Sequence, residues 1–111
     1  MNTRAQVLLW GAQRASAMVL ALCVVVHLIT IIYAVRNGLT AAEILGRTHG
    51  SFLWGGFYAL FVVAVAVHAP IGLRNIFAEF GKRGPAVDTA MIFLALMLVM
   101  WGMRAVWAVV S

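Results

Sequence analysis

Three long apolar runs constrain this chain more than any other feature of its sequence. They cover residues 15–35, 52–71 and 90–110. At about 1.5 Å per residue, a helix of about 20 residues crosses the roughly 30 Å hydrocarbon core of a bilayer. The sequence therefore predicts an all-α protein with three transmembrane helices, at about 7–36, 50–77 and 87–110, in one domain over residues 1–111.

The composition also indicates a membrane protein. Of the 111 residues, 65% are hydrophobic and only 10% are charged, whereas soluble domains are about 25% charged. The first apolar run is longer than the apolar segment of a secretory signal, so we interpret it as a retained helix. The single cysteine, Cys23, lies inside that run, which excludes a disulfide framework within the chain.

The basic residues indicate how the helices are oriented. Cytoplasmic loops carry an excess of Lys and Arg, which places the N-terminus in the cytoplasm and the C-terminus outside. We therefore expect a multi-pass protein of a bacterial or archaeal cytoplasmic membrane. The net charge of +5 suits anionic lipid headgroups or an acidic partner surface better than nucleic acid. The predicted cytoplasmic side carries Arg4, Arg14, Arg74, Lys82 and Arg83, and the opposite side carries Arg36, Arg47 and Arg104.

Turn-forming residues mark the ends of the predicted helices. Asn37-Gly38 is typical of a helix C-terminus. Gly84-Pro85 ends the second connection, and we expect Asp88 to cap the third helix.

The polar residues of the first helix follow one stripe. At 100° per residue, every polar group from residue 16 to residue 30 falls on a single face, and the other faces are aliphatic. Because an unpaired polar group in hydrocarbon is costly, this face is expected to contact protein or a cofactor, while the remainder contacts lipid. Small residues on such a face also serve close helix packing. The stripe consists of Ser16, Leu20, Cys23, His27, Thr30 and Ala34.

The second helix places His68 between small residues. Ala64 and Gly72 lie one turn away on either side, which leaves room for a flat group such as a porphyrin. Imidazole is the usual axial ligand of a b-type heme iron. Arg74, one turn further on, could pair with a heme propionate. The alternatives are an interhelical hydrogen bond for His68 and an ordinary interfacial anchor for Arg74.

The segment His68-Ala-Pro-Ile-Gly72-Leu-Arg74-Asn75-Ile-Phe-Ala-Glu79 resembles the H-x-x-x-G-x-R-H-x-x-x-D signature of a known family. That family is the cytochrome b membrane-anchor subunit of succinate dehydrogenase and fumarate reductase. Its first helix typically carries S-x-x-H-R-x-[ST]-G, and this chain has Trp10-Gly-Ala-Gln-Arg14-Ala-Ser16-Ala. The arginine and the second hydroxyl are retained, whereas tryptophan replaces the first serine.

The resemblance implies a role for several residues. His68 would be an axial ligand of heme b, with Gly72 beside the macrocycle and Arg74 near the propionates. Arg14 would help form a quinone pocket that faces the iron–sulfur subunit, with Ser16 and Trp10 nearby. The implied partners are a flavoprotein subunit, an iron–sulfur subunit, a second membrane-anchor subunit and membrane lipids. Dicarboxylate chemistry would lie in the flavoprotein, and electrons would pass to membrane quinone.

His27 introduces a question about the number of hemes. From the midpoints of the apolar runs, its depth differs from that of His68 by roughly 10–15 Å, so one iron cannot bind both. One interpretation is a two-heme arrangement in which a second anchor subunit completes each ligand pair, with His27 as an axial ligand of the outer heme. The other is that His27 hydrogen-bonds a neighbouring helix. His49 is expected to lie at headgroup level without a ligand role.

A second functional class is also compatible with the sequence. His27 and His68 could move protons in a small transporter or channel-like subunit. A b-type heme spectrum distinguishes this class from a heme-binding anchor.

Overall fold

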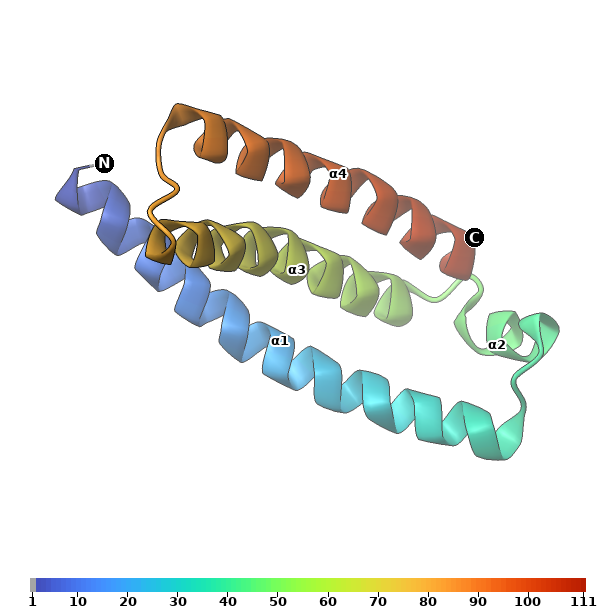
Figure 1. Ribbon diagram of the computed structural model, residues 1–111. Coiled ribbons are helices and arrows are strands. Elements are labelled where there is room, and N and C mark those ends of the chain that lie inside the picture. Colours follow the sequence, from blue (N-terminus) through green and yellow to red (C-terminus); the bar gives the residue numbers. More distant parts are fainter. Residues whose placement is uncertain (1) are drawn as a thin grey trace.

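The computed structural model describes residues 2–111 and is helical through most of its length (Figure 1). The helices are α1 (Thr3–Asn37), α2 (Ala41–Thr48), α3 (Phe52–Glu79) and α4 (Pro85–Val110). Helices α1, α3 and α4 are long and apolar enough to cross a membrane. The predicted all-α class with three membrane-spanning helices is confirmed.

Local chemistry fixes where the long helices begin and end. Asn2 caps α1, since its side-chain oxygen accepts a hydrogen bond of 2.8 Å from the Ala5 amide. The helix ends at Asn37 and is followed by Gly38, whose φ of 130° is unfavourable for other residues. α4 begins earlier than expected, with Gly84 at the cap position and Pro85 in its first turn. The prediction that Asp88 caps this helix is therefore wrong, because Asp88 already lies within the helix.

The short helix α2 was not predicted. It lies between α1 and α3, and Thr40 caps it by accepting a hydrogen bond of 3.1 Å from the Glu43 amide. Its far end is fixed to the C-terminus of α4. The buried Thr48 hydroxyl donates to the Val109 carbonyl at 2.7 Å, and the Gly50 amide donates to the Val110 carbonyl at 2.6 Å. These bonds satisfy carbonyls that the end of α4 would otherwise leave unpaired.

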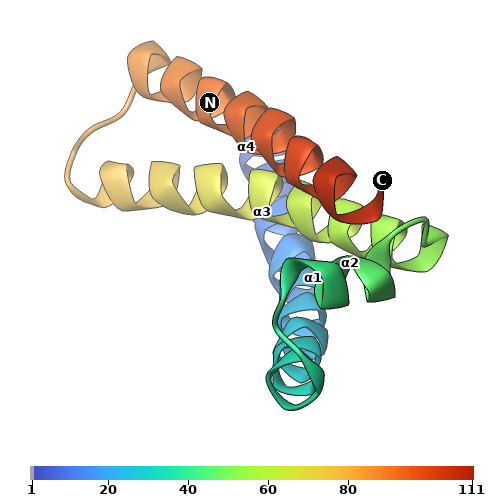
Figure 2. The same cartoon turned by 90° about the vertical axis from the view of Figure 1, so that its right-hand side faces the viewer.

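The central helix α3 packs against both α1 and α4. Figures 1 and 2 show that the N-terminal half of α1 crosses α3 obliquely and that α1 then diverges from α3. Helix α4 follows α3 more closely. The N-terminus and the α3–α4 connection lie at one end of the molecule, and α2 and the C-terminus lie at the other. The basic residues that we expected on one side thus do share one end of the bundle.

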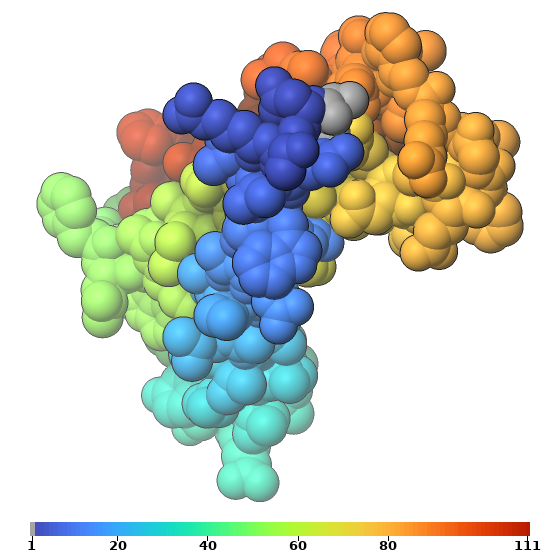
Figure 3. All heavy atoms as spheres, turned by 90° about the vertical axis from the view of Figure 1, so that its left-hand side faces the viewer, coloured from blue at the N-terminus to red at the C-terminus, as the bar shows by residue number. Residues whose placement is uncertain are grey.

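The buried part of the chain is small, and most large apolar side chains are exposed. On α1 the predicted stripe is the face turned toward α3: Ser16 and Cys23 are buried, and the other four members are partly buried. The rest of this helix is left for lipid or a partner. In the space-filling view of Figure 3, the lower part of α1 projects beyond α3 and α4.

Candidate functional site

The site begins with a contact between α1 and α3. Ser16 Oγ lies 3.3 Å from Nδ1 of His68 and also donates a hydrogen bond of 3.0 Å to the Gln13 carbonyl. Ser16 itself is only 6% exposed. The other ring nitrogen of His68, Nε2, makes no hydrogen bond to any residue from 2 to 111. The imidazole is thus held at one nitrogen and available at the other.

Gln13 lies one turn before Ser16 and faces Gly72. A Cβ atom at Gly72 would stand 3.1 Å from Gln13 Nε2, so the glycine allows α1 to approach α3 closely here. A flat group beside Gly72 would therefore require the Gln13 side chain to move. Gln13 Oε1 is buried and has no hydrogen-bond partner within residues 2–111. An unpaired buried acceptor typically costs about 1–3 kcal/mol, so this oxygen is suited to receive a hydrogen bond from a ligand.

A polar cavity of about 320 Å³ opens beside Gln13 at the same end of the molecule. The Arg14 guanidinium stacks over the Trp10 ring at 5.1 Å from its centroid, which holds both groups at the cavity wall. The sequence prediction that Trp10 and Arg14 share a site is consistent with this wall. Ser16, which was expected in the same site, does not line it and instead contacts His68. The wall consists of Gln6, Leu9, Trp10, Gln13, Arg14, Ile71, Arg74 and Asn75.

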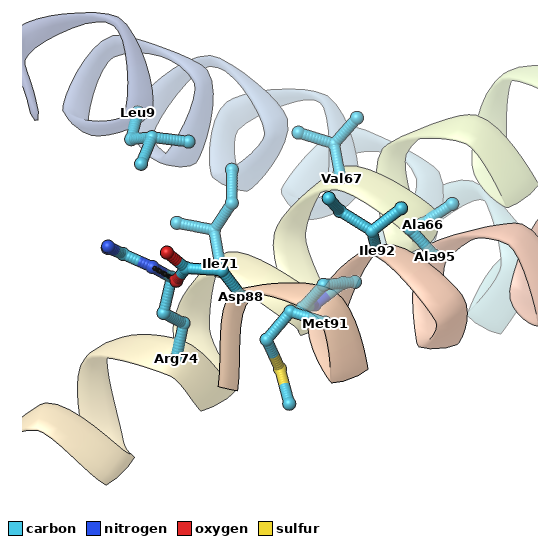
Figure 4. A pocket seen from close by; sticks show the side chains of 10 residues that line it. Leu9, Ala66, Val67, Ile71, Arg74, Asp88, Met91, Ile92 and Ala95 are labelled. Atoms are coloured by element: carbon cyan, nitrogen blue, oxygen red, sulfur yellow. Dashed lines mark hydrogen bonds and ion pairs between the residues drawn. The ribbon is translucent and has the colours of Figure 1, made fainter. Parts of the chain in front are cut away.

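A second, apolar cavity of about 410 Å³ adjoins the polar one between α3 and α4. Leu9, Ile71 and Arg74 line both cavities. Figure 4 shows the head groups of Arg74 and Asp88 meeting at one end of the apolar cavity, with Leu9 reaching it from α1. Arg74 Nε lies 2.7 Å from Asp88 Oδ1, so this ion pair ties α3 to α4.

A comparison with known families shows to which family the chain belongs. Residues 1–107 match the succinate dehydrogenase/fumarate reductase transmembrane subunit. The chain belongs to this family. No curated protein and no solved structure matches it. Membership of this family implies that the chain associates with the other subunits of succinate dehydrogenase or fumarate reductase. The resemblance inferred from residues 68–79 is confirmed.

To bind a heme iron, this transmembrane subunit would need an imidazole nitrogen with a free lone pair. His68 provides one at Nε2 when Nδ1 carries the ring hydrogen, since Nε2 has no hydrogen bond within the described residues. Ligating histidines commonly have a hydrogen bond at the second ring nitrogen. The contacts of the His68 ring therefore fit the iron end of a b-type heme, whereas the Gln13 side chain would have to move away from Gly72 to admit the macrocycle.

His27 has different surroundings in the subunit. Its ring meets Tyr58 and Phe61 of α3 edge to face, with centroids 6.0 and 5.6 Å away. Its Nδ1 is buried and lacks a partner within residues 2–111. The structure therefore does not supply the interhelical hydrogen bond considered from the sequence, and it keeps His27 away from the Ser16–His68 contact. His49 is exposed at the end of α2.

Sequence reasoning missed Gln13 and the Ser16–His68 contact. Gln13 stands where the family usually has histidine, and that departure was the signal that could have drawn attention to it. The contact joins residues 52 positions apart in the sequence, and only the register of α1 against α3 reveals it.

Proposed function

We propose that this chain is the heme b-binding membrane anchor that passes electrons from the iron–sulfur subunit to membrane quinone. The anchor lies with its N-terminus and the α3–α4 connection on the cytoplasmic side, since five basic residues gather at that end. The observation that carries the proposal is the His68 imidazole with Nδ1 held by Ser16 and Nε2 left available. Family membership supports the same reading.

His68 would hold the iron and Arg74 a propionate. When bound, the heme supplies a one-electron carrier whose potential is set by its axial ligands and their hydrogen bonds. Arg74 pairs with Asp88 and is about a quarter exposed, with a relative side-chain exposure of 27%. A guanidinium carries five N–H groups, a donor set that suits the carboxylate of a propionate at the membrane interface.

The two adjoining cavities suit a quinone. A quinone has a polar ring and, in membranes, an apolar tail, and the polar and apolar cavities share Leu9 and Ile71 in their linings. Arg14 can donate to a quinone oxygen, and Gln13 Oε1 can accept from the hydroxyl of the quinol product. Quinone takes up two electrons and two protons to become quinol, so a site at the cytoplasmic interface also gives access to protons.

A second anchor subunit completes the arrangement. His68 would hold the heme iron from this chain, and a histidine of another chain would supply the second imidazole. His27 would serve an outer heme in the same way, and its unpartnered Nδ1 is consistent with a group that finds its contacts only in the assembled complex. The exposed apolar face of α1 offers this second subunit a surface.

The test is a reduced-minus-oxidised spectrum of the complex purified with its flavoprotein, iron–sulfur and second anchor subunits. We expect a b-type band, and His68→Ala should abolish the component that belongs to the cytoplasm-side heme. His27→Ala removes a second component if two hemes are bound and leaves the spectrum unchanged if there is one. His49→Ala is the matched control, because this exposed histidine should leave the spectrum unchanged.

The absence of a b-type band from the wild-type complex would overturn heme binding. The quinone site is tested separately with Arg14→Leu, which should raise the KM for quinone at least about 10-fold, as loss of a charged hydrogen bond implies. Succinate-driven reduction of a water-soluble dye by the iron–sulfur subunit should be unaffected. Equal losses with quinone and with dye would place Arg14 in subunit docking instead.

A further inference from the structure

Ser16 makes two contacts through one hydroxyl group. Its Oγ lies 3.0 Å from the Gln13 carbonyl oxygen and 3.3 Å from His68 Nδ1. The side chain is buried, at 6% exposure, so water does not compete for it. The contact joins α1 to the helix that carries the candidate heme ligand.

The hydroxyl carries a single proton, and this determines the direction of both bonds. A carbonyl oxygen can only accept, and Ser side chains within helices commonly donate to a carbonyl three or four residues earlier. The Ser16 proton is therefore directed to Gln13, at the shorter of the two distances. The oxygen lone pairs remain for His68, so Nδ1 must carry the hydrogen and donate it.

We propose that Ser16 is a positioning residue that holds His68 in the Nδ1–H tautomer and thereby makes Nε2 the iron-ligating nitrogen. This inference rests on the proposed heme-binding function. The inference gives Ser16 a role at the heme ligand rather than in the quinone pocket, because Ser16 does not line the polar cavity. His27 lacks such a hydrogen bond, because its Nδ1 has no partner within the described part of the chain.

The hydrogen bond has two consequences for a bound heme. It fixes the ring plane, since an imidazole held at Nδ1 cannot rotate freely about its Cβ–Cγ bond. It also makes Nε2 a stronger electron donor, which favours the oxidised iron. Loss of the Ser16 hydroxyl should therefore raise the heme midpoint potential and weaken heme retention.

The experiment compares three variants in the whole complex. Ser16→Ala removes the hydroxyl, Ser16→Thr keeps it, and Cys23→Ala is the matched control. Cys23 lies on the same buried stripe at 2% exposure, and its side chain makes no hydrogen bond within residues 2–111. The readouts are the midpoint potential of the b-type band and the affinity for added iron protoporphyrin IX after heme extraction.

We expect Ser16→Ala to raise the potential and to weaken heme binding about 10-fold or more, the usual effect of losing such a partner. Ser16→Thr should restore both values, and Cys23→Ala should leave the potential unchanged. A potential that Ser16→Ala does not move, or that Cys23→Ala moves equally, would overturn the inference while the proposed function stands. The absence of any b-type band in the wild type would instead overturn the proposed function.

A second measurement does not depend on heme or on the folding of a variant. Nitrogen NMR of the full, heme-free chain in bilayers, labelled at histidine, reports which ring nitrogen carries the hydrogen. At mildly alkaline pH, where imidazole is normally neutral, we expect His68 to be protonated at Nδ1. Protonation at Nε2 would overturn the proposed role of Ser16.

Discussion

At the scale of single residues, the two histidines of the membrane-spanning helices differ in one hydrogen bond. The Nδ1 atom of His68 contacts Ser16, whereas that of His27 is buried without a partner in residues 2–111. A buried nitrogen left unpaired costs about 1–3 kcal/mol. His27 therefore gains more than His68 from any donor, acceptor or repacking that a second subunit brings.

Variants of the Arg74–Asp88 pair test whether Arg74 also binds a heme propionate. Arg74→Gln removes a positive charge that, under the proposed function, lies near the heme, and it should lower the heme midpoint potential. Asp88→Asn removes a negative charge, leaves the guanidinium in place and should raise it. Redox titration of both complexes checks the signs.

Stability separates this effect from the loss of the ion pair. The pair is partly exposed, at 27% and 46%, so breaking it from either side should cost less than about 1 kcal/mol in the free energy of unfolding. If Arg74→Gln leaves the midpoint potential unchanged, Arg74 does not serve a propionate.

At the scale of the helices, Gly102 allows α3 and α4 to approach closely. A Cβ atom at this position would lie 2.5 Å from a methyl carbon of Val62. Gly102→Ala should therefore destabilise the chain by about 1–3 kcal/mol through overpacking. Thermal unfolding in detergent or bilayers measures the change.

Two further variants decide whether overpacking is the cause. Val62→Ala added to Gly102→Ala should recover part of the lost stability, because it vacates the space that the new methyl group needs. Gly56→Ala is the matched control, since a Cβ atom there meets nothing within 4 Å. A destabilisation that Val62→Ala does not relieve would contradict the proposed contact.

The short helix α2 depends on its attachment to the end of α4. Thr48→Val keeps the shape of the side chain but removes the hydrogen bond to the Val109 carbonyl, at a cost of about 1 kcal/mol. Hydrogen exchange of residues 41–48 should become faster. Thr89→Val, on an exposed position of α4, should leave that exchange unchanged.

The sequence predicted the long helices and the α1 stripe because both depend on local periodicity. It missed α2, whose eight residues are too few to form a long apolar run, although Thr40 and Glu43 have the spacing of a capping box. Asp88 was misplaced because Pro85 already starts the helix. The contact between Ser16 and His68 could not be predicted, since it depends on how two helices are aligned rather than on either helix alone.

At the scale of the whole molecule, the orientation can be tested with single cysteines. In a Cys23→Ala background, His49→Cys should react with a membrane-impermeant thiol reagent in intact cells. Lys82→Cys should react only after permeabilisation, because it lies at the opposite end of the bundle, in the α3–α4 connection. The reverse pattern would place the N-terminus outside.

The length of α1 has a consequence for the membrane that holds it. Its 35 residues form a rod of about 52 Å, while the hydrocarbon layer is only about 30 Å thick. Such a rod leans or projects, and acyl chains of different lengths change how far it leans. Because Ser16 on α1 contacts His68 on α3, a change in the angle between these two helices would alter this contact, and we expect bilayer thickness to influence it.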